Sequence, residues 1–203
     1  MKDDEKKVSY IPVAVFFIVP LLIGTGIVYA IYSKERSTFD KRIQVLAAND
    51  MHWGALAVVV LGRTLSFLNT YPMVFKSQIM RFSSGNLRSN PFIFKAIGKN
   101  GKDNAIVFNE DGAIGAYNRA NRSLQHLTET FGVLVAGLAV ACQVFPFPVF
   151  VAVCVFGLAR IMHQVGYTLG FGYHALGFWV AFFALATIEG LLFLIALKGF
   201  TAE

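Results

Sequence analysis

The sequence predicts an all-α integral membrane protein with five transmembrane helices, and three observations lead to this fold class. Hydrophobic residues make up 56% of the 203 residues and charged residues only 15%, whereas roughly a quarter of the residues are charged in ordinary soluble chains. Five long apolar stretches follow one another along the chain, separated by prolines or polar clusters. Most lysines and arginines lie in the connections, where positive charge sets the orientation of a membrane protein. The net charge of +6 therefore indicates a lipid bilayer as partner and not nucleic acid.

The first apolar stretch covers residues 8–32 and contains 25 residues without a charge. This length is sufficient to cross a hydrocarbon core of about 30 Å. A signal peptide is the alternative, but the preceding residues mix acidic and basic side chains, and the apolar run is longer than a typical signal core. We therefore expect two parts: residues 1–50 form an N-terminal transmembrane anchor with its connecting segment, and residues 51–203 form a four-helix membrane domain.

The other four stretches cover residues 53–75, 117–143, 149–169 and 173–198. Arg63 interrupts the first of these four. Pro146 must end the helix before it, because proline lacks the N–H group and clashes with the preceding turn. A glycine-containing turn at 170–172 separates the last two stretches. Each stretch is long enough to form a transmembrane helix.

Five spans place the N-terminus, the connection 76–116 and the turn 170–173 on one side of the membrane. That side carries nine basic residues: Lys2, Lys6, Lys7, Lys76, Arg81, Arg88, Lys95, Lys99 and Lys102. The other side carries five: Lys34, Arg36, Lys41, Arg42 and Lys198. The excess of positive charge predicts that the first side, including the 76–116 loop, is cytosolic. This loop has turn signals without an apolar period, so we expect an irregular, mobile segment.

Ionisable residues within a span are costly, so each is a candidate functional residue. In the stretch 117–143, four polar residues recur on an arc of about 80° at 100° per residue. They are Arg119, Arg122, His126 and Glu129. The spacing therefore predicts one polar stripe along this helix.

The stretch 149–169 carries a second stripe, in which Arg160, His163 and Tyr167 lie on an arc of about 60°. Because a tight turn joins the two helices, we expect the stripes to face each other. At a rise of 1.5 Å per residue, Glu129 and Arg160 both lie about 15 Å from the cytosolic side, which predicts an ion pair. The same reasoning predicts a pair between Arg63 and Glu189, about 15 Å from the opposite side.

Four polar residues lie nearer the cytosolic end than the predicted pair of Glu129 and Arg160, namely Arg122, His126, His163 and Tyr167. Their position predicts a polar cavity open to the cytosol. Arginine suits a ligand with carboxylates, because a guanidinium grips a carboxylate through two parallel hydrogen bonds. The alternative is a packed polar seam without a ligand. No metal site is expected, since Cys142 and Cys154 lack metal-ligand spacing and there is no HExxH motif.

Two segments resemble motifs of the MAPEG family, the membrane-associated proteins in eicosanoid and glutathione metabolism. Residues 118–129, Asn-Arg-Ala-Asn-Arg-Ser-Leu-Gln-His-Leu-Thr-Glu, resemble the second-helix signature Arg-x-x-Arg-x-x-x-Asn-x-x-Glu. Residues 159–167, Ala-Arg-Ile-Met-His-Gln-Val-Gly-Tyr, resemble the third-helix motif Arg-x-x-[His/Tyr]-x-x-x-Tyr. The similarity covers residues 53–199. It implies a four-helix bundle of MAPEG type, to which the N-terminal helix is an addition.

The resemblance implies a homotrimer that binds glutathione between subunits near the cytosolic face and acts on a lipophilic small-molecule substrate. It implies a multi-pass protein of the endoplasmic reticulum or another organelle membrane. The implied glutathione-binding residues are Arg119, Arg122, Gln125, His126, Glu129, Arg160, His163 and Tyr167.

Three departures from the family pattern bear on catalysis. His126 replaces the second-helix asparagine, and Gln125 stands where some members have an arginine. Catalytic members also hold the glutathione thiolate with an arginine near the start of the last helix, and this sequence has no arginine after Arg160. Because the thiolate is the nucleophile, a substitute is needed. His174 and Tyr173 are the nearest polar residues and hence the candidate catalytic residues.

Two other classes of protein remain open. The missing arginine favours a non-catalytic MAPEG-like subunit of a larger membrane complex. Residues 168–172, Thr-Leu-Gly-Phe-Gly, resemble a potassium-channel filter. That motif, however, would follow a full-length span and not the short pore helix that a filter requires.

Overall fold

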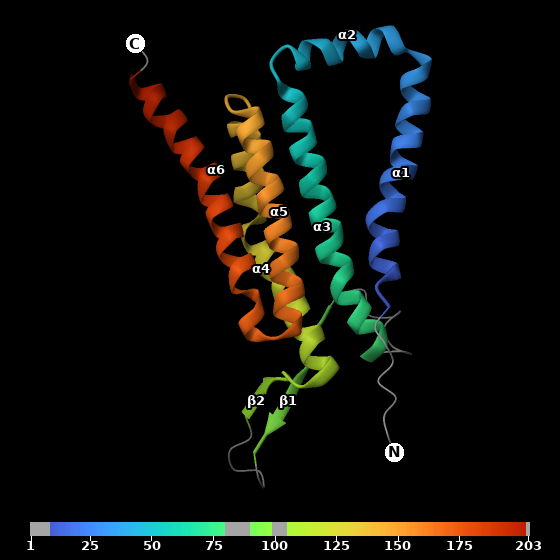
Figure 1. Cartoon of the computed structure of the whole chain (residues 1–203), viewed down its shortest axis with the longest axis vertical. Coiled ribbons are helices and arrows are strands. Elements are labelled where there is room, and N and C mark those ends of the chain that lie inside the picture. The colour runs from blue at the N-terminus through green and yellow to red at the C-terminus, as the bar shows by residue number, and fades with distance from the viewer. Residues whose placement is uncertain (1–8, 80–89, 99–104, 202–203) are drawn as a thin grey trace.

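The computed structural model describes residues 9–79, 90–98 and 105–201, and helices dominate it (Figure 1). In chain order the elements are α1 (Ile11–Lys34), α2 (Arg36–Ala47), α3 (Met51–Ile79), β1 (Phe94–Ile97), β2 (Ala105–Phe108), α4 (Gly112–Ala141), α5 (Pro146–Leu169), the 3-10 helix η1 (Phe171–His174) and α6 (Ala175–Thr201). Among the described residues, five helices are long and apolar enough to cross a membrane. These are α1, α3, α4, α5 and the segment formed by η1 with α6. The prediction of an all-α, multi-pass membrane protein is confirmed.

The described helices run up and down between two ends of the molecule. Figure 1 shows the hairpin of β1 and β2, the start of α1 and the turn from α5 to α6 at one end. The other end holds α2, the turn from α4 to α5 and the end of α6. This arrangement agrees with the sidedness expected from five spans. The side that faces the cytosol stays a prediction, and seven of the nine basic residues counted for it lie outside the described residues.

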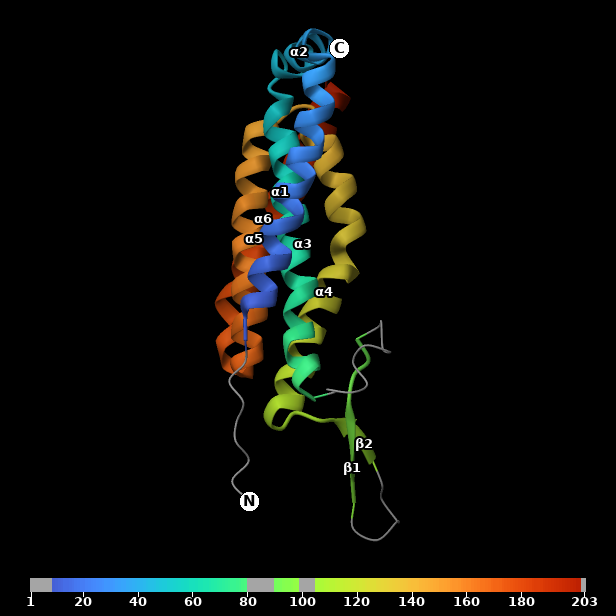
Figure 2. The same ribbon diagram turned by 90° about the vertical axis from the view of Figure 1, so that its right-hand side faces the viewer.

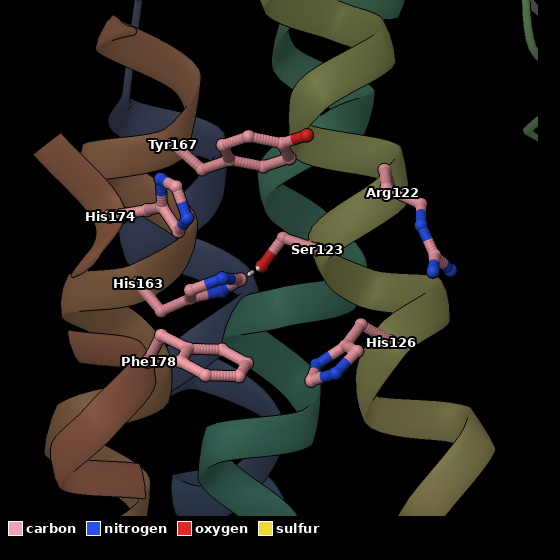
Figure 3. A pocket seen from close by; sticks show the side chains of 7 residues that line it. All are labelled: Arg122, Ser123, His126, His163, Tyr167, His174 and Phe178. Carbon is pink, nitrogen blue, oxygen red and sulfur yellow. Dashed lines mark hydrogen bonds between the residues drawn. The ribbon is translucent and has the colours of Figure 1, made fainter. Parts of the chain in front are cut away.

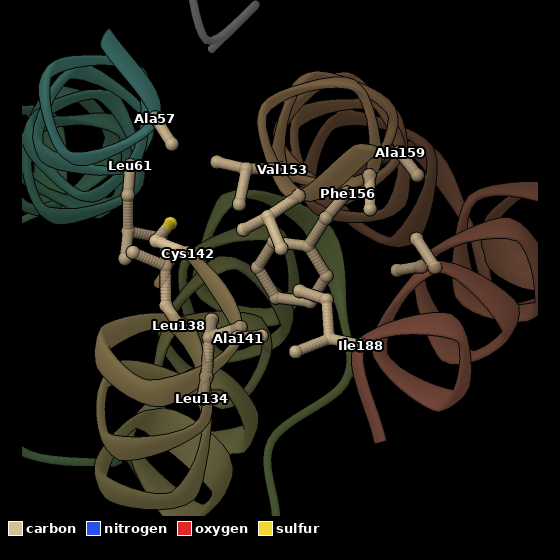
Figure 4. Packing of buried hydrophobic residues seen from close by; sticks show 14 of the residues in the cluster. Ala57, Leu61, Leu134, Leu138, Ala141, Cys142, Val153, Phe156, Ala159 and Ile188 are labelled. Atoms are coloured by element: carbon tan, nitrogen blue, oxygen red, sulfur yellow. The ribbon is translucent and has the colours of Figure 1, made fainter. Parts of the chain in front are cut away.

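Helices α3, α4, α5 and α6 pack around a common apolar core (Figure 4). Each contributes inward-facing side chains: Ala57 and Leu61 from α3, Leu134, Leu138 and Ala141 from α4, Val153 and Phe156 from α5, and Ile188 from α6. Outward-facing residues such as Phe193 and Leu197 on α6 are apolar and exposed. A helix that is apolar all round suits a lipid environment.

Two spans, α1 and α3, contain a proline in the helix interior, and in both the carbonyl that the proline leaves without an N–H accepts a hydrogen bond from the neighbouring helix. Pro72 in α3 has no N–H to offer the carbonyl of Leu68. The side-chain amide of Gln164 on α5, fully buried, donates to that carbonyl at 3.0 Å and to the carbonyl of Ala120 on α4 at 3.1 Å. Gln164 thereby joins three helices. Such compensation is required where no water can satisfy the backbone.

Pro20 creates the same need in α1, the helix that lies outside the four-helix bundle and packs beside α3 (Figures 1 and 2). Ser66 of α3 donates its hydroxyl to the carbonyl of Phe16, at 3.3 Å. Arg63 donates to the carbonyl of Phe17, at 3.0 Å. The predicted pair of Arg63 with Glu189 is therefore wrong, because Arg63 faces α1 on the far side of α3 from α6.

Two short elements were not expected from the sequence. Helix α2 lies across the end of the bundle, roughly perpendicular to the spans (Figure 1). It places Phe39, Ile43 and Leu46 at helical spacing, as a helix at a membrane surface does. Within 76–116, α3 continues to Ile79, and strands β1 and β2 pair antiparallel with Phe94 opposite Phe108.

The hairpin is attached to α4 through side-chain amides. Asn118 accepts a hydrogen bond from the N–H of Ile93 at 2.9 Å and donates to the carbonyls of Ile93 and Asn109. Asn121 donates to the carbonyl of Asn90 at 2.6 Å. The described part of this loop is therefore ordered by α4, and the turn signals at 83–86 and 100–101 lie outside the described residues.

Candidate functional site

A polar hollow lies between α4, α5 and the start of α6, at the end of the bundle that carries the hairpin (Figure 3). Its volume is about 140 Å³. The residues that line it are Arg122, Ser123 and His126 of α4, His163 and Tyr167 of α5, His174 of η1 and Phe178 of α6. The two sequence-predicted stripes thus meet here in part, as expected.

Direct contacts join α4 and α5 at the hollow. Ser123 Oγ lies 2.8 Å from His163 Nδ1. Arg160 donates from one terminal nitrogen to His126 Nδ1 at 3.0 Å and from the other to the carbonyl of Ser123 at 2.6 Å. Since a guanidinium can only donate, His126 Nδ1 carries a lone pair, and a neutral His126 has its proton on Nε2.

Three aromatic rings form one wall of the hollow. Tyr167 lies with its ring centroid 4.9 Å from that of His174, and His163 lies 5.5 Å from His174 and 5.8 Å from Tyr167. The Nδ1–H of His174 donates to the carbonyl of Phe171. In its neutral form this histidine therefore has a free lone pair on Nε2, which can act as a base, and its protonated form has a second donor.

Two glycines allow this close approach of α5 and α6. A Cβ on Gly166 would overlap the backbone carbonyl of Tyr173, and a Cβ on Gly177 would overlap the backbone of His163. The absence of these side chains lets η1 and the first turn of α6 lie directly on α5. This packing positions His174 over Tyr167.

The charged part of the first stripe lies on the outer face of α4. Figure 3 shows the guanidinium of Arg122 turned away from the histidines. It forms an ion pair with Glu129 at 2.6 Å, and both side chains are close to half exposed. Gln125 is exposed as well. The predicted pair of Glu129 with Arg160 is therefore wrong, because Glu129 reaches Arg122 two turns away on its own helix while Arg160 is buried.

Arg119 bonds to three backbone carbonyls. Its guanidinium donates to the carbonyls of Tyr167 at 2.9 Å, Thr168 at 3.0 Å and Glu110 at 3.0 Å. The first two belong to the last turn of α5, where carbonyls have no helical partner and a positive charge is favourable. The structure thus uses Arg119 to hold α5, α4 and the end of the hairpin together.

A second depression, which we call the outer groove, adjoins the polar hollow and shares Arg122 and Tyr167 with it. Its volume is about 190 Å³, and residues 108–110 after β2 form its far wall. Typical small-molecule sites measure about 300–1,000 Å³. The hollow alone is smaller than this range, so a tripeptide-sized ligand would have to extend along the groove or over the outer face of α4.

Among the sequence-predicted catalytic residues, His174 lines the hollow and Tyr173 does not. Tyr173 is 74% exposed and its ring covers Gly170 at the turn. Two residues of the hollow were missed from the sequence, Ser123 and Phe178. Ser123 follows Arg119 by four residues and shares its helix face, which is a signal that spacing gives. Phe178 has no distinguishing signal in an aromatic-rich helix.

The hollow is therefore rich in donors and in groups that can exchange a proton, and its described lining contains no carboxylate. Within the described part of the chain, no cluster of histidine, cysteine and acidic residues could hold a metal ion. Such a lining suits an anionic or thiol-bearing ligand. No protein-family model matches the sequence, and a search of curated proteins finds no significant relative.

Proposed function

We propose that this chain is a membrane-bound, glutathione-dependent transferase or peroxidase of MAPEG type that acts on lipophilic electrophiles or lipid hydroperoxides. The observation that carries the proposal is the polar hollow itself. It brings His163 and Tyr167 from one sequence motif and His126 from the other into one place beside His174. His163 is buried and the other three side chains are partly buried, and polar groups in such positions inside an apolar bundle are costly without a function.

The chemistry of glutathione fits the lining. The tripeptide carries two carboxylates, one ammonium group and one thiol. The exposed Arg122 and Glu129 offer partners for a carboxylate and an ammonium group on the outer face of α4. The hollow, smaller than a whole tripeptide site, has room for the thiol end. A neighbouring chain in a homotrimer would then close the outer face.

His174 is the proposed substitute for the family arginine. The thiol must lose its proton to become a nucleophile, and a free thiol has a pKa near 8.5. His174 Nε2 can accept that proton, and the resulting imidazolium can hold the thiolate. The thiolate sulfur then forms a bond to a carbon of the electrophile. With chlorodinitrobenzene the carbon–chlorine bond breaks and chloride leaves, and with an activated double bond the π bond opens and the other carbon takes the proton from the imidazolium. With a hydroperoxide the thiolate instead takes one oxygen, the alcohol leaves with a proton, and a second glutathione releases water and the disulfide.

Calorimetry and turnover test this proposal together. Glutathione should bind the purified protein with micromolar to millimolar affinity, and turnover should be detectable with chlorodinitrobenzene or a lipid hydroperoxide between about pH 6 and 9. His174→Ala should lower turnover at least tenfold while binding changes little. Tyr173→Phe, on the exposed side of the turn, is the matched control and should leave both unchanged. Absence of glutathione binding by folded protein would refute the proposal.

A non-catalytic subunit of a larger membrane complex is the second candidate. The lack of an arginine after Arg160 favours it, as does the extra helix α1, whose outer face is apolar and exposed. This candidate predicts co-purification with another membrane protein and no turnover under any of the conditions above.

A further inference from the structure

Helices α1 and α3 lie close together near the hairpin end of the bundle and diverge toward the other end, where α2 joins them (Figure 1). The hydrogen bonds and ring contacts that join the two helices in the described chain involve α1 only as far as Phe17. We call residues 21–62, which comprise α2 and the diverging halves of both helices, the arch. Within the arch, α1 is therefore held to α3 only through α2.

The sides of the arch that face each other are apolar and exposed. On α1, Gly24 and Val28 follow Phe17 at the spacing of one helix face. A Cβ at Gly24 would meet no atom within 4 Å, and Val28 is 63% exposed. On α3, Leu56 lies two turns before Arg63 on the face toward α1 and is 44% exposed. Both sides of the arch are thus open to another molecule.

The width of the arch matches one helix. Helix α2, which separates the two sides, has 12 residues, or about 18 Å at 1.5 Å per residue. Packed helices lie about 8–10 Å apart. A helix placed midway between α1 and α3 would therefore lie at packing distance from both.

The C-terminal half of α6 is a helix without neighbours at the same end of the molecule. Helix α6 diverges from α5 toward that end, on the opposite edge of the molecule from the arch (Figure 1). No residue of α6 after Ile188 is buried, and Phe193 and Phe200 are 65% and 88% exposed. We call residues 189–201 the free half of α6. Its length is about 18 Å, equal to that of α3 from its start to Arg63.

The free half and the arch each carry one charge at the base. Glu189 is exposed and forms no ion pair and no side-chain hydrogen bond with the described residues. Arg63 uses one guanidinium nitrogen to bond the carbonyl of Phe17. Its other two nitrogens have no partner in the described part of the chain and are not enclosed, so they are accessible. Charges of this kind within a span are costly unless they meet a partner.

The two charges lie at compatible depths. Arg63 follows the start of α3 by 12 residues and Glu189 precedes the end of α6 by 12, which places each about 18 Å from the end that carries α2. The contacts of glycines between neighbouring helices place Glu189 about 5–10 Å nearer to that end than Arg63. Side chains lean toward the N-terminus of their helix. Because α3 and α6 run in opposite directions, the two side chains lean toward each other and close this offset.

We propose that the free half of α6 of one copy lies in the arch of a second copy, where its Glu189 pairs with Arg63. The two surfaces lie on opposite edges of one molecule, so the contact repeats head to tail and can close into a ring. Lipid acyl chains would cover the apolar sides of the arch but would leave both charges unpaired. A contact between two equal surfaces would place Glu189 against Glu189, which like charges oppose.

The contact agrees with the homotrimer of the proposed function, but it requires no glutathione. Calorimetry with glutathione on the same preparation therefore tests the proposed function separately. A chain that forms this contact without binding glutathione would refute the function alone, and the reverse result would refute this contact alone.

Disulfide cross-linking of the full chain in membranes tests the contact. Two differently tagged chains are co-expressed, one with Leu56→Cys in the arch and the other with Phe193→Cys in the free half. Oxidation with copper phenanthroline should link the two tags. Phe193→Cys expressed alone should not link to itself, and the wild-type chain reports any background from Cys142 and Cys154.

Phe183→Cys is the matched control for the free half. Phe183 is 62% exposed on the same helix but precedes the free half, so this variant should not link to Leu56→Cys. Equal linking of Phe183→Cys and Phe193→Cys would show random collision and overturn the proposal. Linking of Phe193→Cys to itself, or no linking in protein that is folded by circular dichroism, would overturn it as well.

Charge reversal tests the ion pair. Glu189→Lys and Arg63→Glu should each lower the cross-linking at least fivefold, because each places like charges at the base of the arch. The chain that carries both reversals restores opposite charges and should recover at least half of the original cross-linking. Unchanged linking in Glu189→Lys, or no recovery in the double reversal, would refute the pair.

Discussion

Gln164 provides the sharpest test of how the bundle is held together. In Gln164→Leu the carbonyl of Leu68 loses its donor, and Pro72 cannot replace it. A buried carbonyl without a partner costs about 1–3 kcal/mol, while hydrogen bonds between membrane helices average about 0.6 kcal/mol and reach about 1.7. The variant also removes the side-chain Oε1 of Gln164, which has no partner among the described residues. We therefore expect a loss of about 1 kcal/mol in the free energy of unfolding.

A double-mutant cycle isolates the mechanism. Pro72→Ala restores a backbone N–H for Leu68, so it should recover more stability in the Gln164→Leu background than in the wild type. Unfolding in mixed micelles at several denaturant concentrations measures the four free energies. Gln125→Leu is the matched control, because Gln125 lies exposed in a neighbouring span and should tolerate leucine. Equal stability of Gln164→Leu and wild type, or strictly additive effects of the two changes, would refute the reasoning.

Three further predictions follow from other contacts. Arg63→Leu removes the donor to α1 and should weaken its attachment by about 1 kcal/mol, seen as slower cysteine cross-linking between α1 and α3; an unchanged rate would count against this contact. Asn118→Leu removes three hydrogen bonds to the hairpin, so amide exchange in β1 and β2 should accelerate at least tenfold, whereas equal exchange would mean that another contact holds the hairpin. Gly177→Val should abolish folding by colliding with the backbone of α5. Gly190→Val, where nothing lies within 4 Å, should fold normally.

The number and order of the spans could be predicted because apolar length is a strong signal in one dimension. Pro146, the first residue of α5, and the glycine turn after α5 also marked true helix ends. Helix α2 and the hairpin of β1 and β2 were not predicted from the sequence, because short elements have weak periodicity. The hairpin in addition depends on Asn118, whose role at Ile93 involves residues 25 apart in the chain.

The ion-pair partners of Arg63 and Arg160 could not be predicted from how deep each residue lies in its span, because both arginines bond to groups that this depth does not reveal. Arg63 satisfies a carbonyl near a proline in another helix, and Arg160 bonds to a histidine and a carbonyl. Glu129 forms its ion pair with Arg122 on the same helix. Helical spacing did bring His126, His163 and Tyr167 together correctly, since it fixes the faces of two adjacent helices. It could not tell that the guanidinium of Arg122 turns outward.

We propose that glutathione occupies the polar hollow and extends over Arg122. The most direct test is a cryo-electron microscopy map of the full protein in nanodiscs with saturating glutathione. We expect density for a bent tripeptide with its sulfur near His174 and a carboxylate at Arg122, enclosed by a neighbouring chain. A map in which the hollow is empty and the outer face of α4 contacts only lipid would contradict it.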